Sequence, residues 1–248
     1  MHKWRAGFIN ELWLLLYRKK MIAFFTFSVI LPILLAVSLH ALQPILGLVA
    51  VSQSFPIQML SIYTVVWIPL FILTMTADLF PSEVATRTLK LAFLRPNTRF
   101  QVFCAKVAAL AVGIGALLVL LGVVTLICNV FAGTALSFAE GMGVFKAYVA
   151  AFVAMVALSA VFVFVSQFFK SVSGFMVSAI VLYVALKISP FLLSAMSTFS
   201  PASYTDWHML WISHTVAVGK LWSTSLYLLS SCVLFFTLGY YIFDRKEV

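Results

Sequence analysis

The sequence predicts an all-α, polytopic membrane protein, and three observations carry this prediction. Hydrophobic residues make up 64% of the 248 residues and charged residues only 9%, whereas soluble domains carry about 25% charged residues. Residues 21–77 contain no Asp, Glu, Lys or Arg, and about 20 apolar residues suffice for a helix to cross the hydrocarbon core. The apolar runs are continuous rather than alternating, which favours helices over a β-barrel. The composition therefore excludes a soluble globular fold.

We expect six transmembrane helices in a single domain over residues 1–248, at 21–40, 57–77, 102–131, 147–169, 171–190 and 221–243. The fourth and fifth runs are almost contiguous, but one helix over both would be much longer than a bilayer is thick. Pro32 and Pro69 lie near the middles of the first two spans. Proline removes a backbone hydrogen bond, so we expect a bend at each position.

The basic residues predict the orientation. Lys146, Lys187 and Lys220 fall on one side of the expected spans, and the other 13 of the 16 Lys and Arg residues fall on the opposite side. Cytoplasmic loops carry the excess of positive charge, which predicts that both termini are cytoplasmic. The net charge of +9 is thus an orientation signal and an attraction to anionic lipid in the bilayer. It does not indicate a nucleic-acid partner, because no basic soluble domain exists.

Residues 1–20 predict a helix that lies in the membrane interface as an elbow before the first span. Its apolar side chains recur at helical spacing: Trp4, Phe8, Leu12, Leu15 and Leu16. Trp13 and Tyr17 are suited to headgroup depth. The alternative is a plain basic anchor ahead of the first span.

The most informative stretch is the cytoplasmic segment at 78–100. Pro81 suits a first helical turn, and Glu83 stands four residues before Arg87 in the favourable order, with Lys90 on the same stripe. A second face is apolar: Val84, Leu91 and Leu94. Pro96 disfavours helical geometry at Arg95. The pattern predicts an amphipathic helix over 81–95 that either docks on a partner or merely anchors the loop in the interface.

A second helix is expected to start directly after this segment, because Thr98 and Gln101 have the spacing of a capping box. At the other side of the membrane, residues 188–220 are too apolar for a free loop, and we expect short helices that dip into the outer leaflet. Lys187 is expected to snorkel to the outer interface. Asp206, His208 and His214 do not predict a metal site, because a helix would place the two histidines on different faces.

Catalytic motifs are missing from the sequence. It has no Gly-x-x-x-x-Gly-Lys-Ser/Thr phosphate loop and no His-Glu-x-x-His zinc motif. Ser171 lacks a base for nucleophilic catalysis, because the fourth to sixth spans contain no histidine. We therefore expect no catalytic residues, no bound metal and no cofactor held by this chain.

The segment after the second span resembles that of type-2 ABC exporter permeases, the ABC2-type transmembrane family. The resemblance rests on Glu83, Thr88-Leu89-Lys90-Leu91, Leu94-Arg95-Pro96, Arg99 and Lys106. Arg87 departs from the family pattern, which usually has glycine there. The order of an N-terminal interfacial helix, six spans, a long outer segment and a short basic tail extends the resemblance to the whole chain.

The resemblance implies a permease subunit of a bacterial cytoplasmic membrane that works as a homodimer or heterodimer with two separate ATPase subunits. Those subunits would bind ATP and Mg. The coupling helix after the second span would contact them through Glu83, Val84, Arg87, Lys90, Leu91, Leu94 and Arg95. The few charges in the spans favour export of an amphipathic or hydrophobic substrate such as a peptide, a lipid-like molecule or a drug. The alternatives are a non-transporting scaffold or assembly protein and an integral-membrane enzyme.

Overall fold

The computed structural model describes residues 2–46, 55–88, 98–131, 137–192, 204–212 and 218–246. All regular secondary structure in these ranges is helical. Six of the helical segments are long and apolar enough to cross a membrane. The prediction of an all-α polytopic membrane protein is thus confirmed.

The helices follow the six predicted spans but extend beyond most of them. They are α1 (His2–Leu16), α2 (Lys19–Leu46), α3 (Phe55–Ile62), η1 (Tyr63–Trp67), α4 (Ile68–Leu79), α5 (Pro81–Ala85), α7 (Arg99–Phe131), α8 (Phe138–Ser166), α9 (Val172–Leu192), α10 (His208–Ile212) and α11 (Val218–Asp244). The second span consists of α3, η1 and α4, and only residues 167–171 separate α8 from α9. The fourth and fifth runs are therefore two helices, as predicted.

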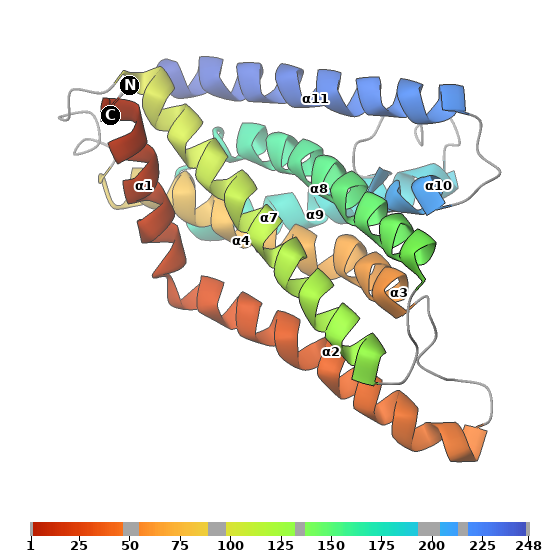
Figure 1. The fold of residues 1–248 in the computed structure, drawn as a ribbon. Coiled ribbons are helices and arrows are strands. Elements are labelled where there is room, and N and C mark those ends of the chain that lie inside the picture. Colours follow the sequence, from red (N-terminus) through yellow and green to blue (C-terminus); the bar gives the residue numbers. More distant parts are fainter. Residues whose placement is uncertain are drawn as a thin grey trace.

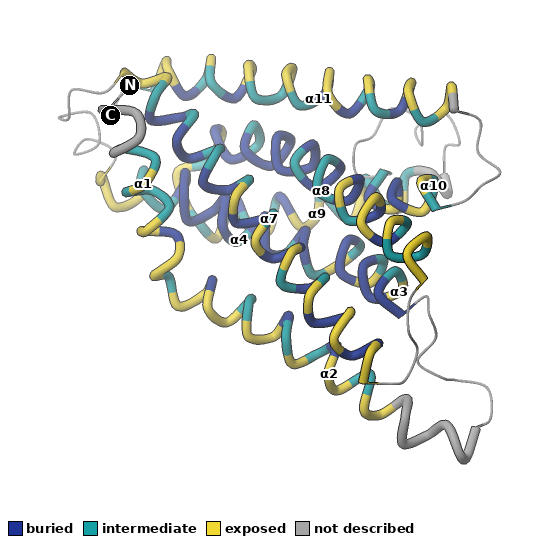
Figure 2. Tube along the Cα trace, in the orientation of Figure 1, coloured by how far each residue is buried: buried dark blue, intermediate teal, exposed yellow. Residues whose placement is uncertain are grey.

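Helix α8 forms the centre of the bundle. It packs against α4, α10 and α11, and much of its length is buried, as Figure 2 shows in dark blue. Its inward face is rich in alanine, including Ala147, Ala151, Ala154 and Ala157, which are fully buried. Small side chains allow neighbouring helices in a membrane to approach closely, which explains how α8 is surrounded on several sides.

The outer helices expose apolar faces. α2 carries Phe27, Ile33, Leu34 and Val37 on its exposed side, and Figure 1 shows its far end lying away from the rest of the bundle. Apolar side chains exposed over such long helices are suited to contact with lipid. The two ends of the chain lie near each other, at the end of the bundle where α1 is found.

Pro69 is accommodated by a local change of helix type. A π-helical turn, η1, precedes it. The Ile68 N–H donates to the carbonyl of Tyr63, five residues back, and not to that of Thr64, the acceptor in an α-helix. Pro69 has no N–H for the carbonyl four residues back, that of Val65. The Tyr183 hydroxyl of α9 donates to this carbonyl instead. Pro32, by contrast, lies within α2, which continues as one helix on both sides of it.

Candidate functional site

The loop after the second span begins with a helix much shorter than predicted. α5 ends at Ala85, with Thr86 as its C-cap, so the expected continuous helix over 81–95 is wrong in its first half. The Thr86 hydroxyl donates to the Ser82 carbonyl at 2.9 Å and also bonds to the Thr88 hydroxyl. Threonine side chains that bond to nearby carbonyls offer the backbone an alternative to the helix. Four of the predicted coupling residues lie outside the described residues: Lys90, Leu91, Leu94 and Arg95.

Arg87 explains how the chain leaves this helix. Its φ is 56°, the one positive φ of a non-glycine residue in the part of the chain that the structure describes. A left-handed residue directly after the C-cap is a common way to end a helix, and glycine adopts it most easily. Glycine is also the residue expected here from the family pattern that the sequence resembles. The departure at Arg87 therefore falls on a position whose backbone favours glycine.

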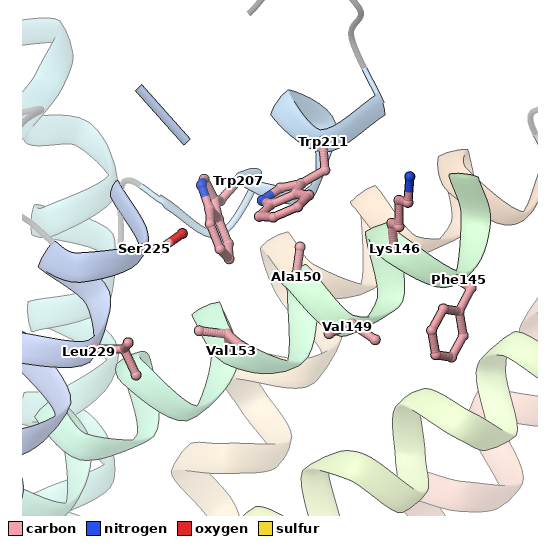
Figure 3. A pocket seen from close by; sticks show the side chains of 9 residues that line it. All are labelled: Phe145, Lys146, Val149, Ala150, Val153, Trp207, Trp211, Ser225 and Leu229. Carbon is pink, nitrogen blue, oxygen red and sulfur yellow. The ribbon is translucent and has the colours of Figure 1, made fainter. Parts of the chain in front are cut away.

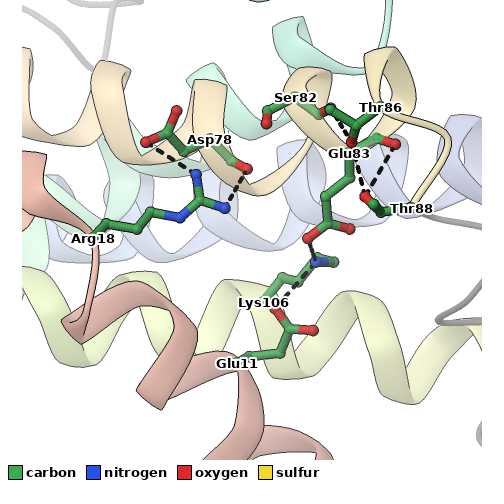
Figure 4. A network of polar contacts seen from close by, with 8 residues as sticks. All are labelled: Glu11, Arg18, Asp78, Ser82, Glu83, Thr86, Thr88 and Lys106. Carbon is green, nitrogen blue, oxygen red and sulfur yellow. Dashed lines mark hydrogen bonds and ion pairs between the residues drawn. The ribbon is translucent and has the colours of Figure 1, made fainter.

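Glu83 does not point along an exposed stripe with Arg87. Its carboxylate contacts the Nζ atom of Lys106 at the start of α7, and the Glu11 carboxylate of α1 contacts the same Nζ at 3.1 Å. The Lys106 side chain is 0% exposed. We call these three residues the Lys106 cluster, which Figure 4 shows joining three helices. The predicted partner-facing stripe of Glu83, Arg87 and Lys90 is therefore wrong for Glu83, whose carboxylate turns inward to the buried ammonium, since a buried lysine needs a carboxylate.

A second ion cluster lies beside the first. Asp78, near the end of α4, accepts from Arg18 at 3.1 Å and from Lys20 at 2.9 Å. The Arg18 guanidinium also donates to the Asp78 backbone carbonyl. We call these three residues the Asp78 cluster. Together the two clusters fix the turn between α1 and α2, the end of the second span and the start of α7 relative to one another (Figure 4).

Glu11, Asp78 and Lys106 were not predicted as site residues. One signal was available for Lys106: it is the only charge within the apolar run 102–131, and ionised residues inside spans are nearly always paired. The identity of its partners was not readable, because Glu83 and Glu11 are 23 and 95 residues away. Spacing along a single helix carries no information about such pairs.

The predicted N-terminal helix is present as α1, which packs mainly against α7. Phe8 and Leu12 are half-buried, whereas Trp13 is exposed and stacks on Tyr17 with ring centres 5.4 Å apart. Leu15 is buried in the core. Trp4 lies in α1, but its side chain is outside the described set. Among the predicted anchor residues whose side chains the structure describes, Trp13 is thus the exposed aromatic one.

The predicted capping box at the start of α7 is confirmed. The Thr98 hydroxyl accepts from the Gln101 N–H, and the Gln101 side chain accepts from the Thr98 N–H, both at 3.3 Å. Arg99 then donates to the backbone carbonyl of Asp244 at the end of α11. Lys246 lies 3.2 Å from Gln167, and burial lowers the pKa of Lys246 to about 8. The C-terminal end of the loop, where α7 begins, is therefore bonded to the residues at the end of α11.

The opposite end of the bundle holds the short helix α10, as expected for residues 188–220. His208 is buried, and its Nε2 lies 3.1 Å from the Ser61 hydroxyl. Lys187 does not simply snorkel outward: it contacts Thr205 and lies 3.7 Å from Asp206. Within the described ranges no three His, Cys, Asp or Glu side chains form a metal-binding group. His214 lies outside those ranges.

Comparison with known families completes the description. A family model described as "ABC-2 family transporter protein" matches residues 11–248, which include every residue of both ion clusters. No curated protein matches the chain.

Proposed function

We propose that this chain, which belongs to the ABC-2 family of transporter proteins, couples ATP hydrolysis in separate ATPase subunits to the export of an amphipathic or hydrophobic substrate. Family membership makes it a permease component of an ABC transporter and an integral membrane protein. The proposal concerns the direction of transport, the class of substrate and the residues that transmit the motion.

The observation that carries the proposal is the Lys106 cluster. Glu83 lies in α5, at the base of the loop that follows the second span, and its carboxylate is bonded to a lysine of the third span. Glu11 bonds the same lysine from α1. A displacement of the loop by a partner would therefore act on three helices at once. Removing one member of a buried ion pair leaves an uncompensated charge, so the connection resists breaking.

The outward surface of this loop is the proposed contact for the ATPase. Ala85, Thr86, Arg87 and Thr88 are exposed next to the buried cluster, and Lys90, Leu91, Leu94 and Arg95 continue the same segment. Two ATPase subunits would bind ATP and Mg, while this chain would bind neither. A second permease, identical or different, would complete the transport path. The excess of basic residues supports a cytoplasmic position for this loop and both termini. The membrane would be a bacterial cytoplasmic membrane.

The substrate class follows from the scarcity of charge. Beyond the ion clusters and Lys187, the described spans expose mainly apolar side chains. Small hydrophilic ions need charged or polar relays within the membrane. A peptide, lipid-like molecule or drug with a large apolar part is a better match for such walls.

Cross-linking of the assembled transporter tests the coupling role. Cys104, Cys128 and Cys232 are first replaced by alanine, and single cysteines are then placed at Thr86 or Arg87. We expect each to cross-link to the coexpressed ATPase. A cysteine at Phe138, which is also exposed but lies at the start of α8, serves as the matched control. Equal cross-linking from position 138, or none from 86 and 87, would contradict the proposed contact.

A further inference from the structure

A cavity of about 330 Å³ lies at the end of the bundle opposite the ion clusters, between α8, α11 and the segment that carries α10. Its floor is one face of α8, formed by Val149, Ala150 and Val153, and Leu229 of α11 adds to the apolar wall. The indole rings of Trp207 and Trp211 lie across the other side, at right angles to each other (Figure 3). The walls of the cavity are therefore suited to contact with a hydrocarbon chain.

Lys146, Ser225 and the N–H of Trp207 are the polar groups beside this apolar lining, and the Ser225 hydroxyl donates to the Leu221 carbonyl of its own helix. Lys146 lies at the edge of the cavity, is exposed and has no ion-pair partner among the described residues; Figure 3 shows its ammonium directed away from the apolar floor. Trp207 is only 4% exposed, yet its Nε1–H has no acceptor within the part of the chain described. Buried N–H groups almost always have an acceptor. This nitrogen is itself enclosed by protein, so the group that the cavity offers to a headgroup is the Lys146 ammonium at its edge.

The size of the cavity matches a lipid chain. From Phe145 to Val153 the lining runs about 12 Å along α8 at 1.5 Å per residue, close to the roughly 15 Å of hydrocarbon in one leaflet. A second cavity of about 270 Å³ adjoins the first, sharing Trp211 and Ser225 with it and adding Leu221 and Trp222. Two adjoining apolar spaces beside one cation favour a lipid with two chains over a single-chain amphiphile.

We propose that this site binds an anionic phospholipid from the leaflet at the α10 end of the protein. One acyl chain lies along the α8 face beneath the two indoles, and the second occupies the adjoining cavity. The phosphate accepts a hydrogen bond from the Lys146 ammonium. Tryptophan and lysine are the side chains that suit this depth of a membrane. The assignment does not depend on what the transporter exports.

Native mass spectrometry of the full chain in detergent tests the proposal, with phosphatidylglycerol and phosphatidylcholine of the same chain length as probes. We expect preferential retention of phosphatidylglycerol. Lys146→Gln should reduce this preference about fivefold, the effect of one basic residue near an anionic surface. Lys170→Gln, at an exposed lysine outside the cavity, is the matched control and should leave the preference unchanged.

A second variant tests the chain rather than the headgroup. Val149→Trp places an indole on the exposed part of the α8 face that lines the cavity, and it should reduce retention of both lipids while the protein elutes as the same species in size-exclusion chromatography. Equal retention of the two lipids by the unchanged protein would overturn the proposal. So would an unaltered preference in Lys146→Gln, or equal losses in Lys146→Gln and Lys170→Gln.

Discussion

The carboxylate of Glu83 and the ammonium of Lys106 are bonded across 23 residues of sequence. This single contact joins the loop after the second span to a buried side chain in the first part of the third span. Glu11 occupies another side of the same ammonium. The cluster contains two carboxylates and one ammonium, and the Asp78 cluster beside it contains one carboxylate and two cations. The six charges therefore balance as a group, although neither cluster is neutral alone.

Replacing Lys106 by methionine should destabilise the protein by about 3–5 kcal/mol, because Glu11 and Glu83 would then face each other in a buried site without a cation. The melting temperature in detergent measures this loss. Lys170→Met, at an exposed lysine, should have little effect.

The triple variant Glu11→Gln, Glu83→Gln, Lys106→Met separates stability from coupling. Replacing a whole buried ion cluster by neutral groups is often close to neutral for stability, so the melting temperature should recover most of the loss seen with Lys106→Met. If the cluster transmits motion, ATPase activity of the assembled complex should no longer respond to substrate. Full transport by the triple variant would show that the cluster only stabilises the fold.

Arg87 is expected to tolerate only residues that accept a left-handed backbone. Arg87→Val should be destabilising by roughly 1–2 kcal/mol, since a β-branched side chain is strained at a φ of 56°. Arg87→Asn removes the same charge but adopts this conformation more easily, so it should remain close to the unchanged protein. Thermal unfolding of the two variants distinguishes backbone strain from loss of charge, which would affect both equally.

Tyr183→Phe should cost about 1–3 kcal/mol, because the Val65 carbonyl would lose its donor inside the bundle. The cost of Tyr183→Phe should be smaller in a Pro69→Ala background, because residue 69 regains an N–H that can donate to the Val65 carbonyl. A double-mutant cycle on melting free energies measures the coupling. Tyr17→Phe, at a tyrosine that is 73% exposed, provides the control, and additive losses would argue against the compensation.

His208 should make the protein less stable in mild acid. Burial lowers its pKa below the usual 6.5, and this effect exceeds the opposing influence of Asp206. The unfolded chain therefore binds a proton at a higher pH than the folded protein, so stability is lost as the pH falls below about 6.5. Melting temperatures compared between pH 7.5 and 5 should show this decline, and His208→Gln should reduce the slope. An unchanged slope would assign the acid sensitivity to other groups.

Much of the architecture was readable because lipid imposes a simple rule: long apolar runs become helices. The start of α7 was also predictable, since the Thr98 and Gln101 capping box depends on residues three apart. The end of α5 was not, because the helical pattern continues past Ala85 while threonine hydroxyls and the backbone at Arg87 end the helix locally. The partners of Lys106 come from two other helices, and only the packed structure brings them together.

The order of the Lys106 cluster along the chain has a consequence for biosynthesis. Glu11 and Glu83 leave the ribosome before Lys106, so the two carboxylates are already at the membrane when the third span arrives with its cation. Domains form from the N-terminus onward during synthesis, and a lysine at 0% exposure must meet both acids before water is excluded around it. Insertion of the third span is therefore the step that supplies the cation to both carboxylates, and a chain stopped before residue 106 would leave Glu11 and Glu83 without it.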